Sequence, residues 1–404
     1  MNHNNRIPYF KVNKTLRMWS LRDEDEGCVV VRETALSMEK PPPPLQEKPQ
    51  ATEIISKQTS ATPKPKSGTG SGLLDILLLY ARFHEWLNAP ESPKAPKPAA
   101  IEKPEKVKTI PPFDIQEIPA AMRKLKMPMS AKLMERWFAG KFNYSPRDAD
   151  ERAEVNQDGM RYPSDMYDTN TITLDWVLRF SRARKQFDRL TKDAIRTPAA
   201  RRILAEKLKI YANKVVDFST AEICGNDIAS LHEQFHFQHV PVDGEFSQKL
   251  KLMLTTSWEH SGAPDDLTGA LGSFNLYAAI GSALFSYDPM SRRSTVEITG
   301  IWVYVKDNYT FTDRQGERSQ YLGHWSRNGV ITIPLDFVAA TSRYIPYTES
   351  PVTVGDPAIR GNVYYPIHNS DFRQWAIRHQ RGGDFIIYSD RRFVRVVPGI
   401  KLHL

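Results

Sequence analysis

The sequence predicts an α+β protein in three parts. Residues 1–118 are rich in proline and lysine and predict a disordered segment, because such sequence cannot bury enough apolar surface to offset the entropy of ordering. Residues 119–262 place apolar side chains at helical spacing and predict a helical domain. Residues 263–404 carry short β-rich runs separated by turn residues, which predict an antiparallel sheet or open barrel with one inserted helix.

The composition of the 404 residues excludes several classes of protein. Two cysteines, Cys28 and Cys224, exclude a disulfide scaffold and a zinc module built on four cysteines. Cys224 follows an apolar segment, and we expect it to be buried. No apolar run approaches the roughly 18 residues of a membrane-spanning helix. The N-terminus lacks the apolar core and cleavage site of an ordinary secretory signal, so we expect cytoplasmic synthesis without a signal peptide.

The net charge of +8 favours anionic partners such as nucleic acid, phospholipid head groups or phosphorylated precursors. Much of the excess lies in Lys-Pro sequence rather than in sequence expected to fold, which argues against nucleic acid. The alternative is that the charge only keeps the protein soluble.

The first part contains a polyproline run over 41–44 and a Gly/Ser-rich run over 67–72, which indicate extended and flexible sequence. An apolar island over 73–87 predicts a short helix, which is marginal in water unless it docks. The helix is either a tethered recognition element for a carrier, chaperone or membrane surface, or it packs on the core of the chain.

The second part shows clear helix signals. Leu133, Met134, Trp137 and Phe138 follow helical spacing, and Gly140 is expected to end that helix. Further helices are expected after Thr197, as N-cap followed by proline, after Asp227 as a cap, and over 246–254. These apolar stripes are typical of a core.

The third part predicts a series of strands, over 272–279, 295–305, 330–334, 351–354, 362–367, 384–389 and 392–397. Asp371 is a plausible N-cap for the one inserted helix, and Gly382-Gly383 is expected to end it. A closing antiparallel hairpin is expected at the end of the chain.

Three groups of residues could carry chemistry, and the first is His232-Glu233-Gln-Phe-His236. Two histidines at i and i+4 on one helix face can bind one Zn²⁺, and the glutamate between them can activate a bound water, as in a zinc metallopeptidase. The usual position of a third histidine holds Val242, and His239 stands where glycine is expected. The alternative is a helix with exposed side chains ahead of a loop.

The second group runs from Lys306 to Asp313 at the end of a predicted strand, and includes Asp307 and Tyr309. A polar loop with Arg318 follows, and then His324. Carboxylates and a phenol at a strand end, beside arginine and histidine, can hold a metal ion or activate water for attack on a phosphate. The alternative is a hairpin loop whose side chains cap turns.

The third group surrounds the inserted helix. As a basic rim it could bind an anionic head group, and as the alternative it is a solvated helix face. Its members are His368, Asp371, Arg373, Arg378, His379 and Arg381.

Over about residues 113–404 the chain resembles an uncharacterised bacterial domain family that is frequently encoded beside type VI secretion genes. The resemblance rests on the stretches 113–119, 267–274, 300–309, 322–325 and 361–390. It implies a secreted antibacterial effector or an accessory protein.

The last 140 or so residues also resemble, more distantly, the catalytic domain of colicin M, which cleaves the pyrophosphate linkage of the peptidoglycan precursor lipid II. The order of elements carries this resemblance: a Gly-rich strand, a strand with Gly300-x-Trp302, an Asp-x-Tyr loop, a helix, Gly-Gly and a closing hairpin. The resemblance implies a colicin-M-like fold.

The family's site is Asp-x-Tyr-Asp followed by His-Arg, and Asp307 and Tyr309 match its first residues. Thr310 replaces the second aspartate, and Gly316 and Glu317 replace His-Arg. Asp313, Arg318 and His324 could substitute from shifted positions.

Three functions follow from these observations. The first is an effector that cleaves lipid II by phosphoester hydrolysis, with Asp307 as base or Mg²⁺ ligand, Tyr309 positioning the phosphate, and Arg318 or His324 neutralising charge. It would be delivered from the bacterial cytoplasm to the periplasm of a target cell and be paired with an immunity protein. The second is a non-catalytic adaptor of the secretion apparatus that binds a spike or carrier protein through its N-terminal segment. The third is the zinc peptidase.

Overall fold

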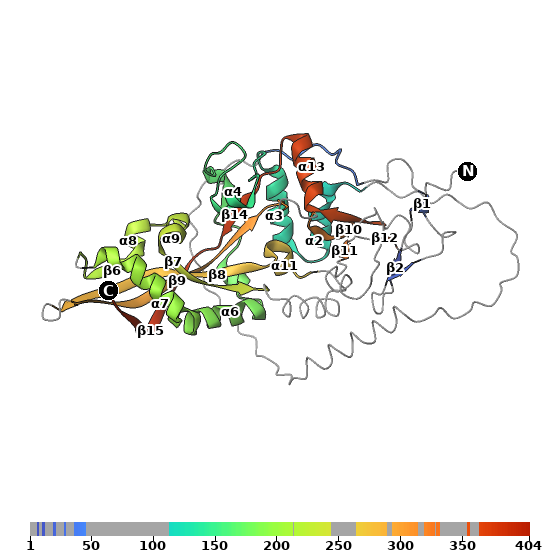
Figure 1. Cartoon of the computed structure of the whole chain (residues 1–404). Coiled ribbons are helices and arrows are strands. Elements are labelled where there is room, and N and C mark those ends of the chain that lie inside the picture. The colour runs from blue at the N-terminus through green and yellow to red at the C-terminus, as the bar shows by residue number, and fades with distance from the viewer. Residues whose placement is uncertain are drawn as a thin grey trace, which may run out of the picture. The chain divides into compact units, whose positions relative to one another are not determined.

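The structure is a computed structural model that describes residues 36–45, 113–212, 214–243, 264–288, 293–313, 319–327, 329–331, 354–355 and 363–404, together with the strands β1 (Arg6–Ile7), β2 (Phe10–Val12), β3 (Trp19–Leu21) and β4 (Cys28–Val29). β1 pairs with β4 and β2 with β3, both antiparallel. The helices predicted over 73–87 and 246–254 lie outside the described residues. The predicted α+β class is confirmed: helices pack on a curled mixed sheet that forms a half-barrel (Figure 1).

The half-barrel is a seven-stranded sheet. Its strands, in spatial order along the main path, are β5 (Tyr167–Asp168), β14 (Phe385–Tyr388), β9 (Arg293–Tyr309), β8 (Phe274–Asp288) and β6 (Asp217–Ser219), with β15 (Arg392–His403) paired to β9 and β7 (His236–Val242) paired to β8. All pairs are antiparallel except that of β5 with β14, so the sheet is mixed rather than purely antiparallel as predicted.

The long hairpin of β8 and β9 is the spine of this sheet. Its register shifts on either side of Ser282, and such bulges bend a strand and increase its twist. Gly300 lies opposite this bulge, and a Cβ there would come within 2.1 Å of the Phe393 ring, so a larger residue would displace that ring. The bulge contributes to the bending of this hairpin.

A second sheet has four antiparallel strands, in the order β11 (Gly329–Ile331), β10 (Tyr321–Ser326), β13 (Val363–His368) and β12 (Val354–Gly355). The predicted strands of the third part therefore all have a counterpart.

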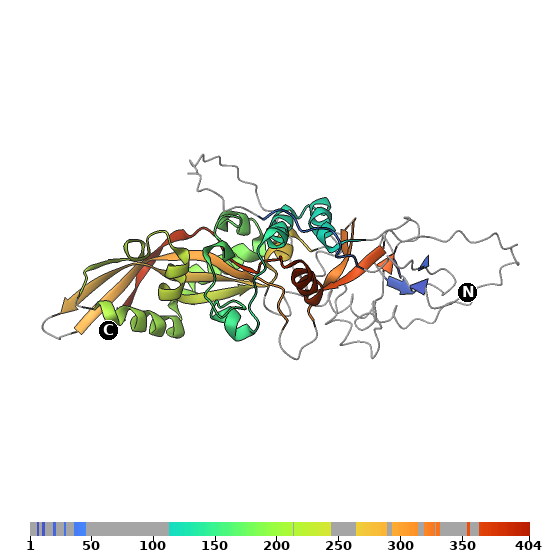
Figure 2. The ribbon, with the colours of Figure 1, turned by 90° about the horizontal axis from the view of Figure 1, so that it is seen from above.

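The helices have the following bounds: η3 (Ile115–Glu117), α2 (Ile118–Lys124), α3 (Pro128–Ala139), α4 (Asp148–Arg152), η4 (Ser164–Met166), α5 (Leu174–Val177), α6 (Ser181–Lys192), η5 (Ala194–Arg196), α7 (Pro198–Leu208), η6 (Lys209–Tyr211), α8 (Thr220–Cys224), α9 (Ile228–Phe235), α11 (Asp266–Leu271) and α13 (Asn369–His379). α6 contacts β7 and β8, and α7 contacts β7 and β15 (Figures 1 and 2). In the described part of the chain, no helix is long and apolar enough to cross a membrane.

Local signals account for the helix boundaries that were predicted correctly. Thr197 caps α7 by accepting from the Ala200 amide, and Asp227 caps α9 by accepting from two amides. α3 ends before Gly140, and a Cβ at Gly140 would lie 2.9 Å from the backbone nitrogen of Gly383. Glycine is needed there because two backbones touch.

Helix α13 confirms the inserted helix but corrects its cap. The N-cap is His368 rather than Asp371, and Asp371 is the third helical residue. Its carboxylate accepts from the His368 amide at 2.7 Å, which is the reciprocal bond of a capping box.

The region predicted to be a helical domain also supplies β5, β6 and β7 to the half-barrel. Buried residues from both sides of residue 263 form one continuous hydrophobic core, which includes the rings of Trp137, Phe138, Phe311, Phe372 and Trp375. The helical region and the β region are therefore packed together as one unit. Cys224 is buried, as predicted.

Candidate functional site

Asp307 and Tyr309 lie on the same face of β9, near its end. They are paired with Ile387 and Phe385 of β14. The Tyr309 ring is only 8% exposed and stacks on Phe385, with ring centroids 5.0 Å apart. Tyr309 is therefore held as part of the aromatic core.

The Asp307 carboxyl lacks a compensating charge among the described residues, since no hydrogen-bonded or ion-paired cation is found there. Burial raises its pKa well above the usual range, and the charge of Glu151 acts in the same direction, against a hydrogen bond from the Asn308 backbone. The side chain is half-buried, so solvent still reaches it. A carboxyl in this environment is a candidate for proton transfer.

The other residues of the second group are not gathered around Asp307. Asp313 accepts from the Gln320 amide at 2.9 Å. Arg318 lies outside the described residues. His324 is on β10 in the four-stranded sheet, paired with Ile331 and Pro366.

Three members of the third group, His368, Asp371 and Arg373, have structural partners. Arg373 donates to Asp384 at 2.8 Å and to Thr312 at 3.3 Å. Asp384 also accepts from the Trp137 indole at 2.8 Å, and together these contacts connect α13 to α3. Burial raises the pKa of Asp384 more than Arg373 and Trp137 lower it. Asp371 is engaged at the start of α13, where His368 Nδ1 lies 3.7 Å from its carboxylate.

The remaining members contact residues 36–45, which we name the strap. Arg378 pairs with Glu39, His379 Nε2 donates to the Met38 carbonyl at 2.7 Å, and Arg381 donates to the Pro43 carbonyl at 2.7 Å. These ten residues of the segment predicted to be disordered thus pack on the folded body. The predicted basic rim is partly covered by the chain itself.

The zinc motif does not lie on one helix, and that prediction is wrong. α9 ends at Phe235, and His236 begins β7. Tertiary pairing overrides the helical spacing here: Phe237, Val240 and Val242 are buried, and β7 pairs with β8. Glu233 is largely exposed, with its carboxylate 3.8 Å from Arg161.

The two histidines instead belong to a cluster of rings that the sequence did not reveal. We name it the His–Tyr cluster: His232, His236, Tyr277, Tyr304 and Tyr388. The two imidazoles are stacked, with centroids 4.4 Å apart and planes at 8°, and Tyr277 meets His232 edge-on at 4.8 Å. His232 Nδ1 is 3.0 Å from the Tyr304 hydroxyl.

Hydrogen bonding assigns the protons in this cluster. A carbonyl only accepts, so His236 Nδ1 carries the hydrogen in its bond to the His232 carbonyl, and His236 Nε2 keeps a lone pair. The Tyr304 hydroxyl is buried, and leaving its hydrogen unpaired would cost about 1–3 kcal/mol. We therefore assign Tyr304 as donor to His232 Nδ1, which leaves a hydrogen on His232 Nε2.

The electrostatics keep both imidazoles neutral. Burial lowers the pKa of His232 to about 2, and the charge of Lys306 and the neighbouring His236 add to this effect. Burial also lowers the pKa of His236, by more than the bond to the His232 carbonyl raises it. Lys306 is itself paired with Glu154 at 2.9 Å, and the second Glu154 oxygen accepts from Tyr167.

The stacked geometry is poor for chelation, because lone pairs in two parallel ring planes do not converge on one metal ion. Within the described ranges, no group of three or more His, Cys, Asp or Glu side chains could hold a metal. The cluster therefore offers one neutral donor and one neutral acceptor on stacked rings. The signal in the sequence was the spacing of His232 and His236, and no pattern in it pointed to the three tyrosines.

These features define an α+β half-barrel protein with a His–Tyr cluster and, on its spine, an acid that no described cation pairs. The chain belongs to DUF6402, a family of unknown function, whose sequence model matches residues 113–404. The prediction of an uncharacterised family over about these residues is confirmed, whereas its link to type VI secretion and its likeness to colicin M stay predictions. No curated protein and no solved structure matches the chain.

Proposed function

We propose that this chain is an antibacterial effector of the type VI kind, and that its half-barrel hydrolyses the pyrophosphate linkage of a lipid-linked peptidoglycan precursor, lipid II. Asp307 is the proton-transfer group. The supporting observation is its carboxyl, half-buried near the end of β9 beside apolar strand neighbours and without a cationic partner among the described residues. The match to the Asp-x-Tyr motif of colicin M adds to it.

In this proposal Asp307 takes a proton from the attacking water or gives one to the leaving oxygen. Such a group typically contributes about 10²–10⁴ in rate. Arg318 and His324 are the candidates for neutralising charge on the phosphate. The described residues offer no three-ligand site for Mg²⁺ or Zn²⁺, so we derive no metal-dependent step. An immunity protein in the producing cell is the expected partner.

The test is toxicity of the full chain, directed to the cytoplasm or the periplasm of a sensitive bacterium. Wild type should cause lysis only from the periplasm. Asp307→Asn, which keeps the shape of the side chain, should lower toxicity by about 100-fold or more. Asp188→Asn, at an exposed carboxylate on α6, is the matched control and should leave toxicity unchanged.

Circular dichroism establishes that each variant is folded, and cleavage of purified lipid II then tests the substrate. Full toxicity of a folded Asp307→Asn protein would refute the assigned role. Lysis without cleavage of lipid II would retain the effector and reject the substrate.

One observation favours a second candidate, a non-catalytic adaptor of the secretion apparatus. Tyr309, Asp371 and Arg373 of the predicted sites are all engaged in packing or capping. The adaptor would bind a spike or carrier protein through residues 73–87. Deleting those residues should then abolish co-purification with the carrier, and the lack of toxicity of wild type in either compartment would favour this candidate.

A further inference from the structure

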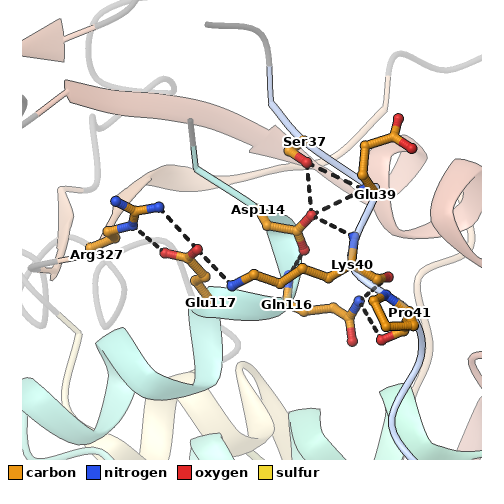
Figure 3. A network of polar contacts seen from close by, with 8 residues as sticks. All are labelled: Ser37, Glu39, Lys40, Pro41, Asp114, Gln116, Glu117 and Arg327. Carbon is orange, nitrogen blue, oxygen red and sulfur yellow. Dashed lines mark hydrogen bonds and ion pairs between the residues drawn. The ribbon is translucent and has the colours of Figure 1, made fainter. Parts of the chain in front are cut away.

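The strap lies extended against the body, far along the sequence from the residues that hold it. Figure 3 shows Ser37, Glu39, Lys40 and Pro41 facing η3 and its flanking residues. The last turn of α13 provides further contacts through Arg378 and His379, and Arg381 just after the helix provides another. We call this surface the strap groove.

The first half of the strap is held through its backbone amides. The Ser37 amide donates to the Phe113 carbonyl at 2.7 Å, and the Ser37 carbonyl accepts from the Ile115 amide at 3.0 Å, as in a parallel strand pair. The Asp114 carboxylate accepts from the amides of Glu39 and Lys40, at 3.1 and 3.2 Å (Figure 3). It also accepts from the Ser37 hydroxyl at 2.9 Å.

The second half is held through its carbonyls. Gln116 donates to the carbonyls of Lys40 and Pro41, at 2.7 and 3.3 Å, and Arg381 donates to that of Pro43. Prolines have no backbone amide hydrogen, so a segment that contains them presents only acceptors. The groove therefore offers an acceptor where the strap has amides, and donors where it has prolines.

Two charged side chains of the strap, Lys40 and Glu39, also form ion pairs with the strap groove. Lys40 pairs with Glu117 at 2.7 Å, and Glu117 is shared with Arg327 (Figure 3). Burial raises the pKa of Glu117, but the bonds from Arg327 and Lys40 outweigh it, so the pKa is lowered and the carboxylate stays charged. Glu39 pairs with Arg378 at 2.6 Å on the opposite side.

We propose that the strap groove is a recognition site for an extended peptide with the pattern Glu-Lys-Pro-Pro-Pro, that residues 37–43 are its resident ligand, and that a partner segment of the same chemistry can replace them. The groove places acceptors at the amides of the strap, donors at its carbonyls and opposite charges at Glu39 and Lys40, and this match supports the inference. Hydrogen bonds to backbone give affinity and the flanking charges give specificity, as in other recognition of extended peptides. The proposal does not depend on the role of Asp307.

Hydrogen exchange of the full chain, followed by mass spectrometry, tests recognition. The amides of Ser37, Glu39 and Lys40 should be protected. Glu39→Arg should speed their exchange by about two- to fivefold, the range for an exposed ion pair. Arg378→Glu alone should do the same, and the two changes together should restore protection. Glu39→Arg lies on the strap and leaves the body intact.

Replacement is tested with a synthetic peptide of residues 35–46 that carries norleucine in place of Met38, so that its mass differs. Millimolar peptide is needed, because a tethered ligand competes at a millimolar effective concentration. The peptide should raise exchange in the strap in a saturable way and leave the half-barrel unchanged, and a scrambled peptide should have no effect. If the charge variants behave as expected but the peptide has no effect, the strap is a fixed part of the fold, and the proposal that a partner segment can replace it is wrong. No effect of the charge variants would overturn recognition itself.

Discussion

Replacing Arg182 with alanine should destabilise the half-barrel markedly and in a pH-dependent way. The guanidinium of Arg182, on α6, lies 2.5 Å from Asp243 and 2.6 Å from Asp265, with a second bond to Asp265 at 2.8 Å. It also donates to Thr268 at 3.1 Å. One cation therefore joins α6 to the end of β7 and the start of α11.

The magnitude follows from burial. Removing one partner of a fully buried pair costs about 3–5 kcal/mol, because the other charge stays buried without compensation. The Arg182 side chain is 23% exposed, so we expect about 2–4 kcal/mol at neutral pH. At about 2–4 °C per kcal/mol, the melting temperature should fall by about 4–16 °C.

The sign of the pH dependence follows from the two carboxylates. Burial raises the pKa of Asp265, but the contacts with Arg182 and the hydrogen bonds from Thr268 together outweigh it and lower the folded pKa, so this stabilisation is lost as pH falls through that value. The pKa of Asp243 stays raised by burial, although Arg182 lowers it. Without Arg182 the pKa values of Asp243 and Asp265 both rise, and each carboxylate lowers the stability of the fold while it is charged. The difference between wild type and variant should therefore shrink as the pH falls toward about 4.

Thermal unfolding of the full chain, followed by tryptophan fluorescence at neutral pH and near pH 4, measures this. Arg189→Ala removes an exposed arginine from the same helix and should stay within about 0.5 kcal/mol of wild type. Arg182→Lys keeps the charge but loses the paired bonds and should be intermediate. A variant as stable as Arg189→Ala, or a loss that is the same at both pH values, would refute the reasoning.

Three further predictions follow from single contacts. Asp384→Ala should cost about 3–5 kcal/mol in urea unfolding, because Arg373 stays buried without its partner, and Asp384→Asn should cost less, since it keeps an acceptor for Trp137. Gly140→Ala should lower the free energy of unfolding by about 1–3 kcal/mol, because its Cβ would clash with the Gly383 backbone, and thermal unfolding measures this loss. Gly159→Ala is the control: it has open space around it and should cost only about 1 kcal/mol for its left-handed backbone. The His232 ring resonances in NMR should not shift between about pH 4 and pH 8, since its pKa of about 2 keeps it neutral, and a titration in that range would contradict its burial against Tyr304.

Much of the fold could be predicted because its signals are local. The caps Thr197 and Asp227 satisfy helix amides within three residues, and the strand runs of the third part carry their own pattern. Strands β5 and β6 could not be predicted, because two or three residues become a strand only where β14 and β8 offer an edge. The strap is a similar case. Its proline-rich sequence has no local pattern that predicts order, and its position is fixed by hydrogen bonds to residues distant in the sequence, such as Asp114.

The candidate site was less accessible to sequence reasoning. The spacing of His232 and His236 suggested one helix face, but the pairing of β7 with β8 turned His236 into a strand residue. The His–Tyr cluster then formed from five elements, α9, β7, β8, β9 and β14, and no spacing in the sequence brings these together. Asp307 was identified from its position after a predicted strand, and the structure adds that none of its described neighbours neutralises it.

That lack of compensation separates Asp307 from the other buried charges. Asp384 has Arg373 and Trp137, Glu154 has Lys306 and Tyr167, and Asp243 and Asp265 share Arg182. A chain that pairs each of these groups can be expected to pair an acid whose role is only structural, because an unpaired one costs stability. Asp307 lies between the buried residues Val305 and Tyr309 on its face of β9, where an apolar side chain would be more stable. A residue that lowers the stability of the fold without a structural role is the pattern expected at functional sites. Asp307 is therefore the first position to substitute.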